Sequence, residues 1–183
     1  MKVITEFNLA DSILDGHRTV IGDDYQGYRN HVMRMLNFCH YLMPDMSDED
    51  RKKFEIAAAF HDIALWTHDR VDYLEPSIDD CKKYLQANQF ERWQSEVSLM
   101  IDMHHFISRY SGEYATSVEV FRRADLVDFS CGIVKFGIPK PFIQQVKGAF
   151  PNAGFHRTLL RFSWRQMKQH PLNPFPMMRF REP

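Results

Sequence analysis

The sequence predicts an all-α protein that folds as a single domain over residues 1–183. Apolar residues recur at steps of three or four along several segments, which is the spacing of one helix face. Residue types that begin or end helices separate these segments, and no segment shows the two-residue alternation of a β-strand. Leu, Ile, Val and Phe make up about a quarter of the chain, above the roughly one fifth that marks disordered sequences, so we expect a helical bundle with a buried core.

The expected helices begin near the N-terminus. A short helix is predicted over residues 5–15 and a longer one over residues 24–43. The apolar stripe of the longer helix consists of Tyr28, Val32, Met35, Cys39 and Leu42. Ser47 and Asp50 resemble a capping box, in which each side chain accepts a hydrogen bond from the backbone amide of the other residue. This pair predicts a third helix that continues to about residue 65.

The remainder of the chain is also predicted to be helical. Pro76 and Ser77, followed by two acidic residues, indicate the start of a fourth helix, because acidic side chains stabilise a first helical turn. Further helices are expected over residues 91–108, 116–130, 141–148 and 156–169. We expect a helical core over about residues 24–130, with C-terminal helices and a Pro-rich tail over residues 139–183. The tail carries apolar side chains that we expect to pack against the body, namely Phe175, Met177, Met178 and Phe180.

Composition and charge exclude several classes of protein. A formal net charge of −1 argues against a nucleic-acid-binding protein that relies on overall positive charge. Residues 35–44, which no stretch without Asp, Glu, Lys or Arg exceeds in length, are about half as long as the roughly 20 residues of a membrane-spanning helix. The acidic N-terminal segment does not resemble a secretory signal. Three widely spaced cysteines outside any CxxC pair favour reduced thiols, and we expect a cytoplasmic protein without membrane association.

Four ionisable residues lie on apolar faces of the predicted helices. His31 shares a face with the apolar stripe of its helix, and His61, Asp62 and Asp125 occupy inward positions on two other helices. A buried Asp costs several kcal/mol unless it is paired or bound to a metal, and imidazole and carboxylate groups are common ligands of divalent ions. The alternative for each histidine is a hydrogen-bonded residue of the core. A shared metal site explains all four, and the small residues Ala57–Ala59 allow neighbouring helices to approach closely.

The motif formed by these residues resembles a known family. The segments YRNHVMRMLNFC, AAAFHDIALW and RRADLVDF resemble the H…HD…D motif of the HD-domain superfamily of metal-dependent phosphohydrolases. The stretch HDIALWTHDRVDYLEPS is similar to a bacterial subgroup of small HD proteins. The resemblance implies an all-helical scaffold in which His31, His61, Asp62 and Asp125 are the metal ligands. It also implies a divalent cofactor, for which Mn, Fe, Co, Ni, Mg and Zn are all candidates.

The resemblance further implies a hydrolase that acts on a phosphate ester, either a nucleotide or another small phosphomonoester, through attack of a metal-bound water. In this mechanism Asp62 holds the metal and accepts the proton of the water. Arg34 and Arg123 lie close to the motif in sequence and are candidates for stabilising the charge of the phosphate or the leaving group; the alternative is that they are surface or salt-bridged arginines. The expected partner is a small-molecule phosphate, and the Phe- and Met-rich tail is also compatible with a homo-oligomer.

Additional histidines extend this interpretation. His104 faces inward and is expected to act in catalysis on the substrate side of the metal, while His105 and His68 are candidates for the same side or for a second metal ion. Asp128, one helical turn after Asp125, either supports the ligands or ends its helix. With a second ion the alternative function is a di-iron oxygenase, as in some members of the HD superfamily. A non-catalytic module that binds a nucleotide is a second alternative, and a helical bundle without metal is a third.

Overall fold

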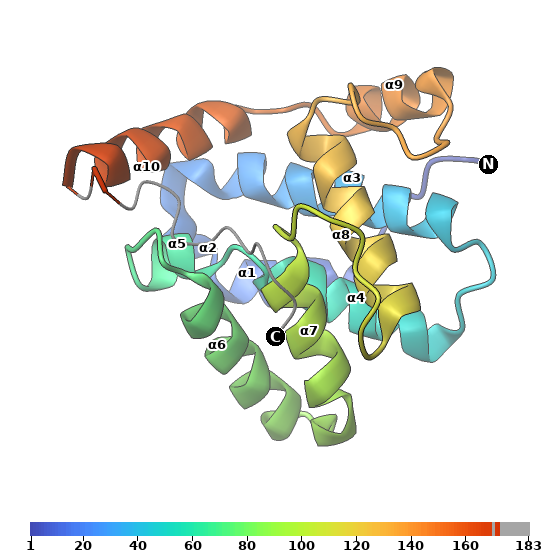
Figure 1. Ribbon diagram of the computed structural model, residues 1–183, viewed down its shortest axis with the longest axis horizontal. Coiled ribbons are helices and arrows are strands. Elements are labelled where there is room, and N and C mark those ends of the chain that lie inside the picture. Colours follow the sequence, from blue (N-terminus) through green and yellow to red (C-terminus); the bar gives the residue numbers. More distant parts are fainter. Residues whose placement is uncertain (170, 173–183) are drawn as a thin grey trace.

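The computed structural model describes residues 1–169, 171 and 172, and this part of the chain is helical without a β-strand, as predicted (Figure 1). The first helices are α1 (Asn8–Gly16), α2 (Arg18–Ile21), α3 (Tyr25–Leu42), α4 (Asp48–Phe60) and α5 (Ala64–Thr67). They are followed by α6 (Leu74–Ala87), α7 (Gln94–Met103), α8 (Ala115–Phe129), α9 (Lys140–Ala149) and α10 (Phe155–Gln169). Two short 3-10 helices, η1 (Gly22–Asp24) and η2 (Glu91–Trp93), precede α3 and α7. None of the described helices is long and apolar enough to cross a membrane.

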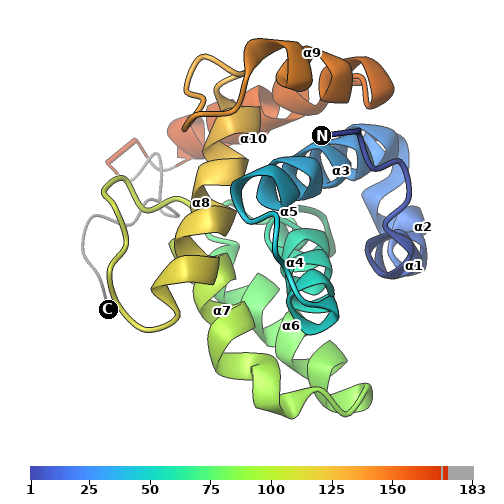
Figure 2. The ribbon, with the colours of Figure 1, turned by 90° about the vertical axis from the view of Figure 1, so that its right-hand side faces the viewer.

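The bundle is organised around α3, α4, α7 and α8. The most extensive helix contact joins α3 to α8, and α4 packs against α1, α3 and α7. Figure 2 shows α6 and α7 together at one end of the molecule and α9 and α10 at the other end. The centre holds large buried aromatic side chains, including those of Tyr28, Phe38, Phe54 and Phe121. Helices that are far apart in the sequence therefore face one common interior.

The start of α4 confirms the predicted capping box, whereas its end differs from the prediction. The amide of Asp50 donates to Ser47 Oγ at 3.1 Å, and the amide of Ser47 donates to Asp50 Oδ2 at 3.1 Å. The helix ends at Phe60, and a turn over residues 61–63 separates it from α5. The prediction of one continuous helix to residue 65 is therefore wrong at its C-terminal end.

Side chains from two other helices stabilise this turn. Tyr28 Oη on α3 accepts the amide of Asp62 at 3.4 Å and donates to the carbonyl of Ala59 at 2.9 Å. Ser77 Oγ on α6 accepts the amide of Ala64 at 3.2 Å. These tertiary bonds pair two amides that a continuous helix would direct to carbonyls four residues back. The helix is therefore interrupted at the pair of residues that the sequence motif singles out.

Other element boundaries agree with the sequence to different degrees. α6 begins at Leu74, ahead of the predicted start at Pro76, and α9 and α10 begin within one residue of the prediction. α7 ends at Met103 instead of residue 108, and His104 Nδ1 donates to the carbonyl of Ile101 at 2.6 Å at this end. Packing of the tail residues Phe175, Met177, Met178 and Phe180 lies outside the described residues. All three cysteines carry free thiols, those of Cys39 and Cys81 buried and that of Cys131 exposed.

Candidate metal centre

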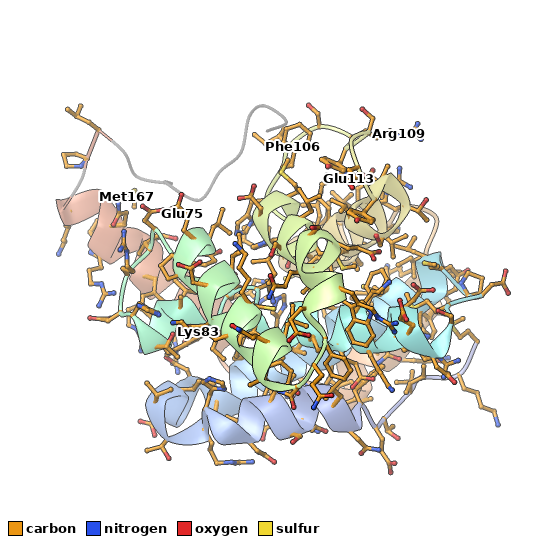
Figure 3. The ribbon with its side chains drawn as sticks, turned by 90° about the horizontal axis from the view of Figure 1, so that it is seen from below. Glu75, Lys83, Phe106, Arg109, Glu113 and Met167 are labelled. Carbon is orange, nitrogen blue, oxygen red and sulfur yellow. The ribbon has the colours of Figure 1, made fainter. Side chains whose placement is uncertain are left out.

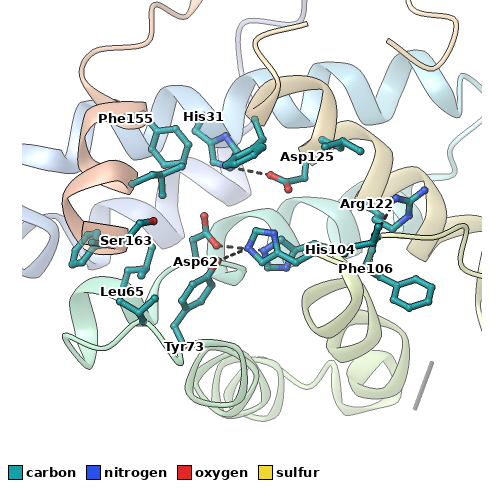
Figure 4. Close-up of a pocket in the computed structure, with 17 residues that line it drawn as sticks. His31, Asp62, Leu65, Tyr73, His104, Phe106, Arg122, Asp125, Phe155 and Ser163 are labelled. Carbon is teal, nitrogen blue, oxygen red and sulfur yellow. Dashed lines mark hydrogen bonds and ion pairs between the residues drawn. The ribbon is translucent and has the colours of Figure 1, made fainter. Parts of the chain in front are cut away.

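The predicted ligands come from separate elements and meet in the interior. His31 lies on α3, His61 and Asp62 lie in the turn after α4, and Asp125 lies on α8 (Figure 4). His104, directly after α7, joins them from the opposite side. Each of these side chains is buried. The interruption of α4 places the His61 and Asp62 side chains toward this group, whereas the residues before it belong to the core.

The ligand atoms lie close enough to share a metal ion. His31 Nε2 lies 3.0 Å from His61 Nε2 and 3.5 Å from Asp125 Oδ1. Asp62 Oδ2 lies 3.3 Å from His61 Nε2, and Asp62 Oδ1 lies 3.4 Å from His104 Nε2. Among the described residues, three groups have ligand atoms within 4.8 Å of one another: His31, His61 and Asp125; His61, Asp62 and His104; and His104, His105 and Asp125. The four predicted ligands thus fall into two overlapping groups that share His61.

Hydrogen bonds fix which ring nitrogen carries the proton in the three buried histidines of this site, His31, His61 and His104. In each, Nδ1 faces an oxygen acceptor and is therefore the protonated nitrogen. The pairs are His31 with Asp128 Oδ2 at 2.7 Å, His61 with the Ala58 carbonyl at 2.8 Å, and His104 with the Ile101 carbonyl at 2.6 Å. All three Nε2 atoms then present lone pairs to the same interior space. This is the tautomer and orientation that metal-binding histidines adopt.

The lone pairs face other acceptors instead of hydrogen atoms. His31 Nε2 and His61 Nε2 face each other at 3.0 Å, and two neutral imidazoles in this tautomer have no proton to place between them. Asp62 Oδ1 and His104 Nε2 are buried without a hydrogen-bond partner. Buried polar atoms are nearly always satisfied, so unsatisfied acceptors that converge call for a cation. Nitrogen and carboxylate donors of this kind fit a divalent transition metal.

The pKa values of the two carboxylates, Asp125 and Asp62, are shifted in opposite directions. Burial raises the pKa of Asp125 to about 7; nearby His104 lowers it, but Asp62 and Asp128 raise it further. Burial also acts to raise the pKa of Asp62, but His61 and His104 outweigh it and hold this pKa well below its usual range. The protein itself therefore does not place enough positive charge beside Asp125 to keep the pKa of this carboxylate in its usual range. A divalent cation held among these groups would supply that charge.

Arg34 does not have the role that the sequence suggested. Its Nε and Nη2 donate to the two oxygens of Asp128 at 2.5 and 2.7 Å, and its Nη1 donates to the carbonyls of Phe150 and Pro151 at 3.0 and 3.2 Å. Its guanidinium is buried in this pair and does not line the cavity beside the ligands. The interpretation of Arg34 as a catalytic residue that stabilises the charge of the leaving group is corrected: it holds Asp128, which in turn accepts a hydrogen bond from His31. Asp128 is thus the supporting residue that its spacing from Asp125 suggested.

Two other predicted residues also lie away from the site. His68 is exposed and its Nε2 pairs with Asp80 Oδ2 at 3.0 Å, so it is not available to a metal beside Asp62. Arg123 Nε donates to Glu119 Oε1 at 2.7 Å, and the guanidinium lies outside the cavity lining. Both assignments are corrected for the same reason: an acidic neighbour in the fold directs the side chain elsewhere.

A cavity of about 410 Å3 lies directly beside the ligands. His31, Asp62, His104, His105 and Asp125 form its polar floor. Burial and the neighbouring His104 lower the pKa of His105 well below its usual range, and burial together with Asp62 raises that of Tyr73 well above its usual range. Tyr73 Oη therefore donates to the neutral His105 Nε2 at 2.6 Å.

Several residues of the cavity had not been expected there from the sequence. Tyr73 lies in the motif stretch VDYLEPS, so a signal was present there. Phe155 stacks on His31 with ring centroids 4.1 Å apart and planes 13° apart, and Arg122 lines the cavity where Arg123 was expected. No local pattern marks Phe155, because its position depends on how α10 lies along α3.

Comparison with known families shows to which family the chain belongs. The profile of the HD domain matches residues 28–130, which is more than half of the chain and includes all four motif residues. The chain belongs to the HD domain family, whose members are mostly metal-dependent phosphohydrolases and include some non-catalytic proteins. Comparison with curated proteins and with solved structures finds no match.

Proposed function

We propose that this protein is a metal-dependent phosphohydrolase that cleaves a small phosphomonoester, with one divalent ion held by His31, His61, Asp62 and Asp125. The observation that carries the proposal is the set of buried acceptors that face each other without hydrogen atoms between them. Membership of the HD domain family supports the same reaction class. The cavity beside these atoms provides space for a substrate.

The residues around the cavity have distinct tasks in this reaction. A bound divalent ion neutralises phosphoryl charge and acidifies water. Asp62 Oδ1 faces the cavity without a hydrogen-bond partner, so it can orient the attacking water and accept its proton. The water oxygen joins phosphorus, the bond from phosphorus to the ester oxygen breaks, and the leaving alkoxide takes up a proton to become the alcohol. His104 lies within reach to donate a hydrogen bond or this proton when it is charged.

One observation favours a second candidate. His104 Nε2 faces Asp62 Oδ1 at 3.4 Å, and His61, Asp62 and His104 form a ligand group of their own. This group supports a two-ion site, and with two irons the function would be that of a di-iron oxygenase. Because His68 pairs with Asp80 instead, this candidate depends on His104 and His105. Metal per chain, iron content and oxygen consumption separate it from the one-ion hydrolase.

Asp62→Ala tests the proposed function directly. Elemental analysis of protein purified without chelator should show a divalent ion in the wild type, and loading with Mn, Fe, Co, Ni, Mg or Zn should support phosphate release from 4-nitrophenyl phosphate. Asp62→Ala should abolish release and lower the metal content, while its far-ultraviolet circular dichroism stays that of the wild type. The matched control is Asp79→Ala, an exposed acid on α6, which should behave as the wild type.

The outcomes of this experiment are distinct. Most of the activity remaining in Asp62→Ala contradicts the assignment of the site. A wild type that binds metal and a nucleotide but releases no phosphate with any of the six ions favours the non-catalytic alternative.

A further inference from the structure

We propose that the substrate is a phosphomonoester with an apolar alcohol part, an alkyl or aryl group, rather than a nucleotide or a sugar phosphate. This inference rests on the proposed hydrolase function and adds the class of substrate to it. Three features of the cavity carry it: an apolar wall, a basic side chain that is already paired, and an apolar rim that reaches solvent. In the reaction, water supplies an oxygen to the phosphate and the apolar alcohol leaves.

Away from the metal ligands the wall of the cavity is mostly apolar, and its polar members are Tyr73, Arg122 and Ser163. α10 contributes Phe155, Leu159 and Phe162, and Figure 4 shows Phe155 beside His31. The other apolar wall residues are Leu65, Val71, Phe106, Ile107, Leu126 and Phe129. Such a wall favours an apolar group, because that group leaves water on binding, whereas the hydroxyls of a sugar would exchange water for a surface with few hydrogen-bonding groups.

The basic side chain that lines the cavity, Arg122, is already paired with a carboxylate. Among the described residues, Arg122 is the arginine that lines the cavity, and no lysine does. Its Nε and Nη2 donate to the two carboxylate oxygens of Glu119, both at 2.8 Å, and its Nη1 donates to the carbonyl of Phe106 at 3.1 Å. A second or third phosphate group would therefore be desolvated here without a cationic partner. This pairing argues against nucleoside di- and triphosphates.

The apolar wall continues to the rim of the cavity. Ile107 and Phe129 line the cavity, yet they are 56% and 53% exposed. Ile107 belongs to the connection between α7 and α8, which Figure 3 shows at the upper edge of its view, where Phe106, Arg109 and Glu113 are labelled. Exposed apolar residues that border a cavity mark a site for an apolar ligand. The volume of about 410 Å3 lies in the usual range for small-molecule sites, roughly 300–1,000 Å3.

A series of n-alkyl phosphates tests the inference. Full-length protein loaded with the activating ion is given butyl, hexyl and octyl phosphate, with adenosine monophosphate and glucose 6-phosphate as polar comparisons. We expect kcat/KM to rise about fourfold for each methylene that becomes buried, until the cavity is full, and to stay low for both polar esters. Calorimetric titration with octylphosphonate, which is not hydrolysed, should show binding with a negative heat-capacity change that shrinks to nearly zero for methylphosphonate.

Variants at the rim provide the structural control. Ile107→Ser and Phe129→Ser should each lower kcat/KM for octyl phosphate by about fivefold and for butyl phosphate by a smaller factor, because the longer chain reaches further toward the rim. The matched control is Ile133→Ser, whose side chain is 84% exposed and lies outside the cavity lining. This variant should leave kcat/KM unchanged for butyl, hexyl and octyl phosphate.

Failure of this inference differs from failure of the proposed function. Phosphate release from all esters without a rise along the alkyl series, or faster release from adenosine monophosphate, overturns the apolar substrate and leaves the hydrolase in place. No phosphate release from any ester, including 4-nitrophenyl phosphate, overturns the hydrolase. In that case octylphosphonate binding that weakens in the rim variants supports an apolar ligand, and equal binding by all variants overturns it.

Discussion

Replacing Asp128 with alanine removes the carboxylate that joins Arg34 to His31. In the native protein, Asp128 accepts from Nε and Nη2 of Arg34 at 2.5 and 2.7 Å and from Nδ1 of His31 at 2.7 Å. Burial alone would raise the pKa of Asp128, but His31 and Arg34 hold it well below its usual range, so the carboxylate is charged. The substitution leaves the guanidinium of Arg34, which is 2% exposed, without a counter-charge.

The expected loss in the free energy of unfolding depends on the hydrogen bonds that Arg34 keeps. Removing one partner of a buried ion pair typically costs about 3–5 kcal/mol, because the other charge stays buried and uncompensated. Arg34 Nη1 retains the carbonyls of Phe150 and Pro151 as acceptors, which places the expected loss near the lower end, about 3 kcal/mol. His31 also loses the acceptor that fixes its tautomer, so metal affinity should fall about 10–100-fold.

Urea unfolding of metal-free protein, followed by circular dichroism, measures the first effect, and competition with a chromophoric chelator measures the second. Asp79→Ala, the exposed control, should change the free energy of unfolding by less than about 0.5 kcal/mol. The double variant Arg34→Met, Asp128→Leu should recover most of the lost stability, because it removes both buried charges. It should keep the lower metal affinity, since His31 still lacks its acceptor.

A loss of less than about 1 kcal/mol in Asp128→Ala would contradict the assigned role of the ion pair, because the guanidinium would then find other compensation. A double variant Arg34→Met, Asp128→Leu that is less stable than Asp128→Ala would contradict it as well. Unchanged metal affinity in Asp128→Ala would show that Asp128 does not orient His31.

Two further substitutions probe the site and its support. His104→Ala should lower kcat/KM about 10²–10³-fold with metal per chain unchanged, as expected when one contact to the reacting group is lost; loss of a whole equivalent of metal would instead make His104 a ligand of a second ion. Tyr28→Phe removes the hydroxyl that bonds the Asp62 amide and the Ala59 carbonyl and should cost about 1–2 kcal/mol in urea unfolding, whereas Tyr41→Phe, the matched control on α3, should cost little. A Tyr28→Phe variant as stable as the wild type would mean that the turn after α4 does not need this hydroxyl.

Local patterns were sufficient to predict the helical class and much of the candidate site. The spacing of apolar residues predicted α3, and Ser47 with Asp50 predicted the start of α4, because both depend on groups within one helix. The inward phase of His31 and Asp125 is likewise a property of single helices, whereas His61 lies in the turn after α4. The resemblance to the H…HD…D motif added the ligand set, and the fold brings these residues together in its interior.

Non-local contacts decided the features that the sequence could not show. α1 begins at Asn8, where Glu55 of α4 accepts the amides of Leu9 and Ala10 at 3.0 Å each, and no residue near α1 signals this cap.

The same limit applies to the arginines and to the cavity. Whether Arg34 faces a substrate or a carboxylate depends on Asp128, which lies on another helix, and the apolar wall depends on where α10 packs. Helix periodicity records which side of a helix is buried, and the charges and surfaces that meet that side are set only when the helices assemble.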